Sequence, residues 1–287
     1  MQNIWTKFIN ENNFDVVVGV QAKGAYILGS IADRIKAKTV GWQHNSYASY
    51  IESKGIYYWN QDYLFDTYLS KLNAYVVLNE YDEKQYLEKK NIKATTIYNP
   101  KSFVSPKKAE LNSKRFIAVG ALVRAKGFDL LIEAFRIFAQ NNPGWELDIF
   151  GEGKEHDSLQ SMIRNSGLEG QITLRGVSET IDSEMLDSSA LLLSSRWEGM
   201  PMVVLEALEV GLPVVAFDIT AMIPLVDDGK EGIIVPQFDV NSYAQAMERI
   251  ADDVSLRKSM GKAASQKAEC FSVEVIKNKW VDLFESL

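Results

Sequence analysis

Two glutamates, Glu198 and Glu206, stand on either side of a Gly-x-Pro turn that links an apolar run to a helical pattern. If Pro201 lies in the first turn of that helix, Glu198 is in the loop above the carboxyl end of a strand and Glu206 is a little over one turn into the helix. Both carboxylates can then face the crevice at the end of a parallel sheet, where doubly wound proteins bind ligands. Glutamate pairs on a solvated helix face are common, so the spacing alone leaves that alternative open.

Short apolar runs rich in valine or isoleucine recur along the chain and are typical of buried parallel strands. Between most of them lie helical patterns, such as those at 130–138 and 203–208, in which apolar residues recur every three or four positions. Strands that alternate with helices predict an α/β protein with doubly wound parallel sheets. The predicted strands are Asp15–Val20, Thr39–Trp42, Ala74–Leu78, Thr95–Tyr98, Arg115–Val119, Glu146–Phe150, Gln171–Leu174, Ala190–Ser194, Pro213–Phe217 and Gly232–Val235, and the last predicted helices are Val240–Asp252, Leu256–Glu269 and Val273–Ser286.

The stretch Asn99–Ala109 predicts a boundary between two domains, because an Asn-Pro turn leads there into lysines and Pro106 without an apolar period. About five strand–helix units follow this boundary, enough for a complete Rossmann-like domain, whereas four predicted strands precede it. We therefore expect a partial N-terminal Rossmann-like domain at residues 1–103, a complete one at residues 104–270, and a C-terminal helix at residues 271–287 that packs back on the first domain.

Composition and charge describe an ordinary globular protein. The 287 residues are 46% hydrophobic and 24% charged, with a formal net charge of -7. Neither half of the chain has the basic character expected of a nucleic-acid binder. The single cysteine, Cys270, cannot form an internal disulfide, and neither a signal peptide nor an apolar stretch long enough to span a bilayer is recognisable. A reducing, cytoplasmic location is the resulting expectation.

The segment around the two glutamates resembles the Glu-x7-Glu motif of the retaining glycosyltransferases of family 4, whose fold is called GT-B. The run Ser-Arg-Trp-Glu-Gly-Met-Pro and the later Glu-Ala-Leu match as well. The resemblance implies that Glu198 contacts hydroxyls of the donor sugar and that Glu206 accepts hydrogen bonds from the ribose of the nucleotide, roles that suit a carboxylate. The backbone N–H groups at the helix start would face the donor diphosphate, and these positions are Gly199, Met200, Pro201 and Met202.

A second segment, Phe116–Asp129, resembles the strand–glycine–arginine–loop–lysine–glycine segment with which that family clamps the donor diphosphate. Lys126 and Gly127 match the pattern, and the resemblance implies that Lys126 holds phosphate oxygens, a surface lysine being the alternative. The family's arginine falls at Ala121, so Arg124 is the nearest replacement, although a shift of three residues changes where a guanidinium points. Glycines near strand ends complete the implied donor site, and they are Gly120, Gly151, Gly153 and Gly176.

In the N-terminal part, His44 follows the predicted strand Thr39–Trp42, at the edge where acceptor-side residues of GT-B enzymes cluster. The resemblance implies that His44 contacts the donor sugar or the acceptor, and a purely structural histidine is the alternative. Aromatic residues also crowd the stretch from Tyr57 to Tyr68. They could stack on sugar or lipid, but a helix packed on the sheet is the simpler explanation.

The resemblance further implies a retaining hexosyltransferase, in which the nucleoside diphosphate departs and an acceptor hydroxyl attacks from the same face. The expected donor is a nucleoside-diphosphate sugar, with UDP favoured over GDP. No metal or other cofactor is expected, because the sequence has no metal-ligand spacing. The usual roles of the family imply a glycan or glycolipid acceptor and a role in cell-surface polysaccharide synthesis. They also imply a place in the cytoplasm, peripheral at the inner membrane face.

Met1 corresponds roughly to the middle of the family's N-terminal domain, so that domain is expected to be incomplete, with a partner chain as one source of the preceding strand–helix units. Two other classes of protein stay open. A non-catalytic partner subunit of another glycosyltransferase would expose an apolar sheet edge. A sugar-nucleotide epimerase with a GT-B fold agrees less well with the Glu-x7-Glu context.

Overall fold

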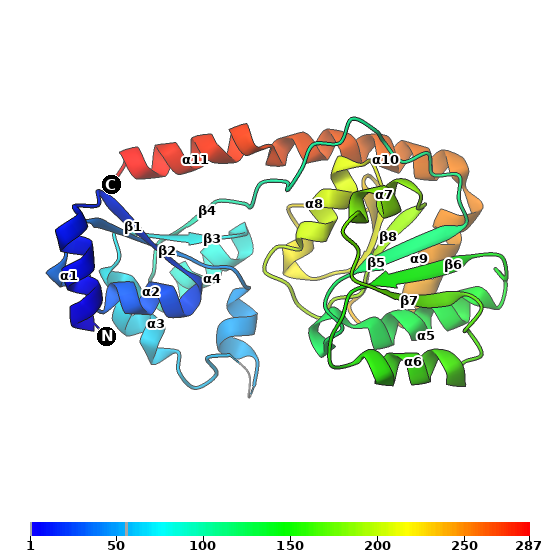
Figure 1. Cartoon of the computed structure of the whole chain (residues 1–287), viewed down its shortest axis with the longest axis horizontal. Coiled ribbons are helices and arrows are strands. Elements are labelled where there is room, and N and C mark those ends of the chain that lie inside the picture. Colours follow the sequence, from blue (N-terminus) through cyan, green and yellow to red (C-terminus); the bar gives the residue numbers. More distant parts are fainter. Residues whose placement is uncertain (1, 55–56) are drawn as a thin grey trace. The chain divides into compact units, whose positions relative to one another are not determined.

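The computed structural model describes residues 2–54 and 57–287, and the chain divides into two compact units (Figure 1). Unit 1 comprises Met1–Pro100, Glu198–Met200 and Val273–Leu287. Unit 2 comprises Lys101–Trp197 and Pro201–Ser272. Each unit contains one parallel sheet, so the protein is an α/β protein with two Rossmann-like domains, as the sequence predicts.

The sheet of unit 1 has four parallel strands in the order β1-β2-β3-β4. Val18 of the first strand is opposite Val40 of the second, and Val40 is opposite Ala74 of the third. Parallel neighbours require crossover connections, which helices supply. The strands are β1 (Val16–Val20), β2 (Lys38–Trp42), β3 (Ala74–Val77) and β4 (Ala94–Thr96), and the helices of this part of the chain are α1 (Gln2–Asn12), α2 (Gln21–Gly29), α3 (Tyr63–Tyr68) and α4 (Glu80–Lys90).

The last helix, α11 (Val273–Glu285), belongs to unit 1 although it follows unit 2 in the sequence. Its Ile276 is buried in one apolar cluster with Val40 and Ile97. The ring of Trp280 lies 5.0 Å from the ring of Trp42, at the end of β2. Apolar burial therefore holds this helix against the sheet.

The aromatic stretch from Tyr57 to Tyr68 falls into two parts. Phe65 on α3 is fully buried in a core cluster with Tyr26 and Tyr86, as a helix packed on the sheet predicts. Tyr57 and Trp59 precede that helix and are exposed. On the helix itself Tyr63 is 60% exposed, whereas Tyr58, before the helix, packs against the same cluster, so a packed helix explains only some of these aromatic residues.

The sheet of unit 2 has six parallel strands in the order β10-β9-β8-β5-β6-β7. Helices cover both faces: α5 packs against α6 and α9, and α8 packs against α10 (Figure 1). All the predicted strands of the chain are present, with ends that differ by no more than two residues. The strands of unit 2 are β5 (Arg115–Val119), β6 (Glu146–Phe150), β7 (Ile172–Gly176), β8 (Ala190–Leu193), β9 (Val214–Phe217) and β10 (Gly232–Val235), and its helices are α5 (Phe128–Ala139), α6 (His156–Asn165), α7 (Ile181–Leu186), α8 (Met202–Glu209), α9 (Val240–Asp252) and α10 (Val254–Ala268).

The strand order of unit 2 reverses at β5. From β5 the chain proceeds to β6 and β7 on one side, and it then returns to β8, β9 and β10 on the other. Such a reversal leaves a crevice at the carboxyl ends of the two central strands, where ligands bind. The loops that leave β5 and β8 at this point are residues 120–127 and 194–201, which contain most of the predicted site residues.

Candidate functional site

The loops after β5 and β8 are joined by hydrogen bonds to three successive carbonyl groups. The guanidinium of Arg196 donates to Arg124 O at 2.8 Å. The backbone N–H of Arg196 donates to Ala125 O at 2.7 Å, and Ser194 Oγ donates to Lys126 O at 2.8 Å. The segment that carries Lys126 is therefore held along its length by the residues that lead into the Glu-x7-Glu motif.

Gly127 completes this junction. It has φ +65°, and a Cβ built on it would lie 2.1 Å from Ser194 O, far inside van der Waals contact. Gly167 provides a comparison, because it has φ +69° but nothing lies within 4 Å of its Cβ position. Only a glycine satisfies both the left-handed backbone and the close approach at position 127.

Gly127→Ala is expected to lower the free energy of unfolding by at least about 1 kcal/mol more than Gly167→Ala. Both variants acquire the left-handed strain, but only the first forces a methyl group against a backbone carbonyl. Urea unfolding of the two variants and the wild type measures the difference. Equal losses in the two variants would show that the two loops separate easily at this point.

Arg196 also forms a bidentate pair with Asp129 on the first turn of α5, with N–O distances of 2.8 and 2.7 Å. The hydrogen bond from Arg196 holds the pKa of the Asp129 carboxyl below its usual value. Paired N–H···O bonds of this kind fix both side chains in one orientation.

Three glycines and Lys126 meet at the ends of β5 and β6. The side chain of Lys126 lies across Gly120, whose Cβ would be 3.2 Å from Lys126 Cε. A Cβ on Gly151 would lie 1.9 Å from Gly120 O, and one on Gly153 would lie 2.4 Å from Leu122 O. The missing side chains allow the two loops to touch backbone to backbone and leave the Lys126 stem flat over the strand end.

Gly176 and Arg124 are placed differently. Gly176 ends β7, its carbonyl accepts the N–H of Gly151 at 2.7 Å, and the space around its Cβ position is empty. Arg124 is exposed, and the contact described above uses its carbonyl rather than its guanidinium. Ala121 is exposed as well. Both positions that could carry the arginine of a diphosphate clamp thus face solvent.

Pro201 is the N-cap of α8 and does not lie in its first turn, which corrects the expectation from the sequence. Its ψ of 104° is extended, and its carbonyl accepts the N–H of Val204, so the helix begins at Met202. Because proline has no N–H, the donors available around this helix start are those of Gly199, Met200 and Met202.

Glu206 is half-buried, a little over one turn into α8. Its Oε1 accepts a hydrogen bond from Ser102 Oγ at 2.8 Å. A carboxylate has about four acceptor positions, so further hydroxyl groups can bind beside Ser102.

Glu209, one turn further along α8, was not identified from the sequence. It is only 1% exposed, and it accepts hydrogen bonds from Lys101 Nζ at 2.6 Å, Lys108 Nζ at 3.2 Å and the N–H of Ser105 at 2.8 Å. These bonds attach the segment that enters unit 2 to the helix that carries Glu206. In the sequence, the lysines at 101 and 108 were the only signal for a buried carboxylate. They stand about one hundred positions before Glu209, and no motif relates the two places.

The residues Glu198–Met200 group with unit 1, which also contains His44. A Cβ on Gly199 would lie 2.5 Å from His44 O, so glycine permits backbone contact there. Glu198 is half-buried, whereas Met200 is buried with its Sδ 3.2 Å from the N–H of Asn99. The structure therefore brings His44 next to the loop that carries Glu198.

The His44 ring contacts the Trp42 ring in a tilted arrangement, with centroids 4.2 Å apart and an interplanar angle of 54°. Burial lowers the pKa of His44, so its imidazole is neutral at pH 7. Its Nε2 is buried and has no hydrogen-bond partner among the described residues. A neutral imidazole nitrogen can donate to or accept from a hydroxyl group, which suits a sugar ligand.

Gln43 fixes the backbone beside His44, a role that the sequence did not reveal. Its Oε1 accepts from the hydroxyls of Tyr75 and Tyr86 at 2.8 and 2.5 Å. Its Nε2 donates to Asn45 O at 2.6 Å and to Asp82 Oδ2 at 3.2 Å. The side chain thus spans the loop that contains His44.

Asp82 in this cluster gives unit 1 a pH dependence. Burial raises the pKa of Asp82 from 3.8 to about 7, so the folded state retains a proton that the unfolded state releases near pH 4. Stability is therefore expected to fall as the pH rises from about 4 to about 7. Urea unfolding at pH 5 and pH 8 should show a smaller change in the free energy of unfolding for Asp82→Asn than for the wild type. The control Asp252→Asn, at an exposed site, should keep the wild-type change. A wild-type change in Asp82→Asn would refute the role of Asp82.

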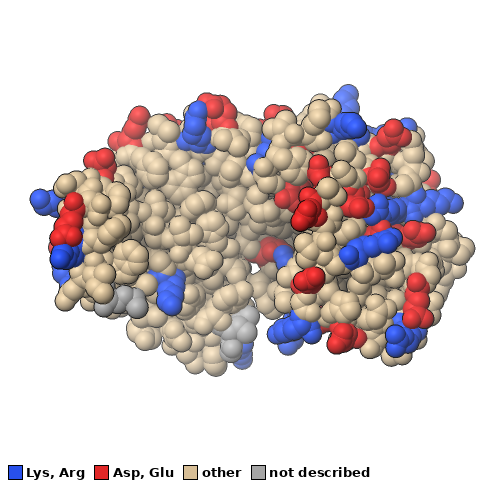
Figure 2. Space-filling model, in the orientation of Figure 1, with Lys and Arg blue, Asp and Glu red and all other residues tan. Residues whose placement is uncertain are grey.

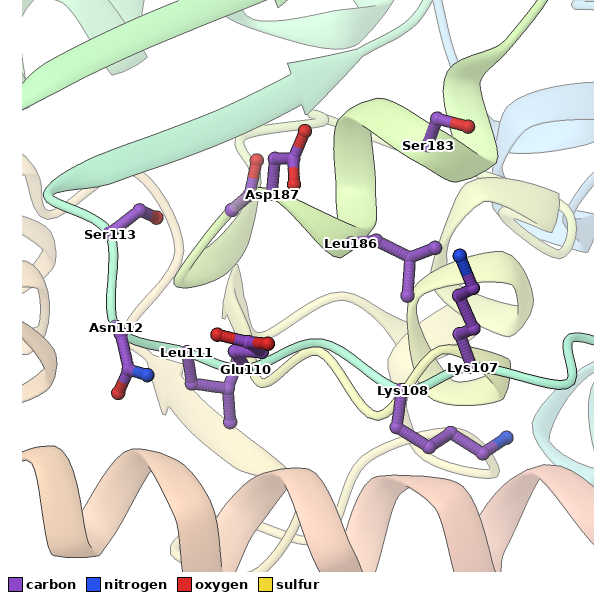
Figure 3. A pocket seen from close by; sticks show the side chains of 10 residues that line it. Lys107, Lys108, Glu110, Leu111, Asn112, Ser113, Ser183, Leu186 and Asp187 are labelled. Atoms are coloured by element: carbon purple, nitrogen blue, oxygen red, sulfur yellow. The ribbon is translucent and has the colours of Figure 1, made fainter.

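Cavities elsewhere in the described part of unit 2 are not lined by the predicted site residues. A cavity of about 440 Å³ lies between residues 107–113 and α7, and none of the predicted site residues lines it (Figure 3). On the face of unit 2 that Figure 2 shows, acidic and basic side chains are interspersed. Among residues 2–54 and 57–287, no group of three or more His, Cys, Asp or Glu side chains is arranged to hold a metal ion. Within the same ranges, no helix has the length and apolar character needed to cross a membrane.

The sequence of unit 2 has a recognisable family pattern. Residues 101–267 match the model of the family described as glycosyl transferases group 1, and this range is more than half of the chain. The chain belongs to this family. The match includes the loops after β5 and β8. Membership of this family, together with the fold shared with solved structures, supports a glycosyltransferase of the GT-B fold.

Curated relatives of the chain are longer than it is. An exopolysaccharide phosphotransferase of Streptomyces coelicolor is 35% identical over 224 residues, which cover 75% of this chain and 24% of that protein. A poly(ribitol-phosphate) alpha-N-acetylglucosaminyltransferase of Staphylococcus aureus is 26% identical over 255 residues, which cover 87% of this chain and 51% of that protein. The chain thus spans about a quarter of the first relative and about half of the second.

Solved structures share the fold. A TarM mutant of Staphylococcus aureus, in complex with fondaparinux, alpha-GlcNAc-glycerol and UDP, superimposes with a TM-score of 0.86 at 24% identity and covers 99% of this chain and 58% of that one. Sucrose-phosphate synthase of Thermosynechococcus elongatus superimposes with a TM-score of 0.87 at 16% identity, covering 99% and 76%. At these identities the likeness shows the fold alone.

Proposed function

We propose that the chain is a retaining glycosyltransferase of family 4 that moves a sugar from a nucleoside-diphosphate sugar to a hydroxyl of a glycan or glycolipid. The observation that carries this proposal is the pair of joined loops at the strand-order reversal of unit 2. Lys126 and Glu206 follow two paired strands, β5 and β8, and the intervening carbonyls are hydrogen-bonded between the loops. A cation and a carboxylate beside one crevice suit the diphosphate and the ribose of one nucleotide.

In the proposed site, Glu206 accepts hydrogen bonds from ribose hydroxyls and Glu198 accepts them from hydroxyls of the donor sugar. Lys126 and the N–H groups around the start of α8 oppose the charge that develops on the departing diphosphate. His44 contacts the donor sugar or the acceptor, whose hydroxyl attacks from the face that the diphosphate leaves. The remaining proposed donor contacts are Arg124, Gly120, Gly151, Gly153 and Gly176.

We propose UDP as the nucleotide and a cell-surface polymer as the acceptor. TarM and the pneumococcal GtfA are described in complex with UDP. Relatives named for poly(ribitol-phosphate), poly(glycerol-phosphate) and amylovoran synthesis support a polymer acceptor. The proposed reaction uses no metal or other cofactor and takes place in the cytoplasm, at the inner face of the membrane.

Calorimetric titration of the purified chain with UDP and then GDP, with divalent ions chelated, tests the donor site. We expect binding of both nucleotides, with UDP the tighter. Release of free sugar from a UDP-sugar panel then identifies the donor. Absence of binding to either nucleotide would contradict the proposal.

A second candidate function is a non-catalytic partner subunit, and the free edge of the unit 1 sheet favours it. Among the described strands, β1 pairs with β2 alone, and Val20 at its end is 48% exposed. Trp5 and Phe8 on α1 are exposed, and an apolar cavity of about 210 Å³ runs between α1 and β1. An edge of this kind accepts a further strand–helix unit of a partner chain. A GtfA/B complex is among the structural neighbours.

The two candidates differ in nucleotide binding and in assembly. A non-catalytic subunit would bind neither UDP nor GDP, and it would associate through β1. Light scattering of the wild type and of Val20→Lys, which places a charge on the exposed edge, measures that association. Turnover of a UDP-sugar by the chain alone would exclude this second candidate.

A further inference from the structure

Beside the bond from Ser194 Oγ to Lys126 O, the side chain of Arg196 connects the two loops of the proposed donor site. Nη1 of Arg196 bonds both Arg124 O and Asp129 Oδ1, and Nη2 bonds Asp129 Oδ2. The arginine is half-buried, and its own carbonyl accepts from Gln237 Nε2 at 3.2 Å. Arg196 is thereby fixed at both its backbone and its side chain, two residues before Glu198.

The guanidinium and the backbone N–H of Arg196 bond Arg124 O and Ala125 O in the segment that carries Lys126. Residues Arg124–Lys126 form a single 3-10 turn, which is a weak element by itself. Asp129 is at the start of α5, three residues after this turn, and Arg196 bonds both Asp129 and the turn. A guanidinium can bind a carboxylate with two parallel bonds and still reach a carbonyl, because its five N–H groups lie in one plane.

We propose that Arg196 is the positioning residue of the donor diphosphate site: it locks the Lys126 turn onto the Glu-x7-Glu loop so that both hold their binding geometry together. This inference rests on the proposed function. In it, Arg196 does not touch the donor. It acts by reducing the freedom of residues 121–127, so that little ordering is required when the diphosphate binds.

The test compares Arg196→Lys with a matched control, Arg136→Lys. Arg136 also forms a bidentate pair, through Nε and Nη2 with Glu133 at 3.1 and 2.7 Å, and both residues are on α5, outside the loops. Calorimetry with UDP is expected to give roughly tenfold weaker binding for Arg196→Lys, since one ammonium cannot replace the fork and the carbonyl contact. Binding of uridine, which has no phosphate, should be unchanged, and the control should match the wild type in both titrations.

Hydrogen exchange of residues 121–127 without ligand separates positioning from direct contact. Faster exchange in Arg196→Lys, but not in Arg136→Lys, is the expected result. Weaker UDP binding with wild-type exchange would overturn the proposal, because Arg196 would then act on the ligand itself. Should Arg196→Lys fail to fold, Asp129→Asn removes the charged partner at nearly constant volume and must show the same faster exchange.

The exchange measurement also keeps this inference separate from the proposed function. If the wild type binds no nucleotide, the donor-site assignment fails. Faster exchange in Arg196→Lys would still show that Arg196 holds the turn, and unchanged exchange would refute that role independently of any ligand.

Discussion

Glu206→Ala is expected to weaken the binding of UDP by roughly 1.5–3 kcal/mol, the range for losing a hydrogen bond to a charged group. The carboxylate is a little over one turn into α8, where Ser102 Oγ donates a hydrogen bond to its Oε1. A ribose has two adjacent hydroxyls that can donate hydrogen bonds to such a carboxylate, whereas the alanine side chain has no acceptor. Calorimetry with the wild type and the variant gives the difference directly.

Two controls assign that loss to the ribose. Ser102→Ala removes the hydroxyl now bonded to Glu206 and leaves the carboxylate, so its UDP affinity should stay close to that of the wild type. A UDP analogue without the 2′ and 3′ hydroxyls should bind wild type weakly and lose little further in Glu206→Ala. If the analogue and UDP suffer equally from Glu206→Ala, the carboxylate does not contact the ribose.

The architecture was predictable because each strand carries its own signal. Ala190–Leu193 and Val214–Phe217 are buried throughout in a parallel sheet. They therefore appear in the sequence as continuous apolar segments, and their predicted ends differ from the observed ones by no more than one residue. Helix α9, capped by Asp239, begins at Val240 as predicted, whereas α10, capped by Asp253, begins at Val254, two residues before the predicted Leu256. Apolar pattern and local structure therefore coincide most closely in the buried strands.

Contacts between distant segments left no such signal. Arg196 meets Asp129 across 67 residues, and its place in the matched run Ser-Arg-Trp-Glu-Gly-Met-Pro does not indicate that partner. Gln43 is similar, because its partners Tyr75 and Tyr86 come from β3 and α4 and become neighbours only once the sheet of unit 1 forms. Motif spacing therefore indicated the groups proposed to touch the ligand, whereas the residues that hold those groups required the fold.

Lys126→Met is expected to lower kcat for sugar transfer by roughly 100- to 1,000-fold, the usual effect of removing one donor that stabilises developing charge. Methionine keeps a flexible stem over Gly120 and removes the ammonium, so the junction with Ser194 should survive. A group that acts mainly on the leaving diphosphate lowers kcat more than it lowers the affinity for free UDP. Steady-state kinetics and UDP titration of the same preparations separate the two quantities, with Lys107→Met, a change at an exposed lysine, as the control.

Arg124→Met in the same assays decides what replaces the arginine absent at Ala121. Its guanidinium is exposed while its carbonyl is bonded to Arg196, so the loss should be smaller than for Lys126→Met, roughly tenfold. Equal losses of kcat in the two variants would show that Lys126 and Arg124 act together as a two-cation clamp on the diphosphate. A wild-type kcat in Lys126→Met would instead show that Lys126 does not stabilise the departing diphosphate. The N–H groups around the start of α8 would then remain as the diphosphate site.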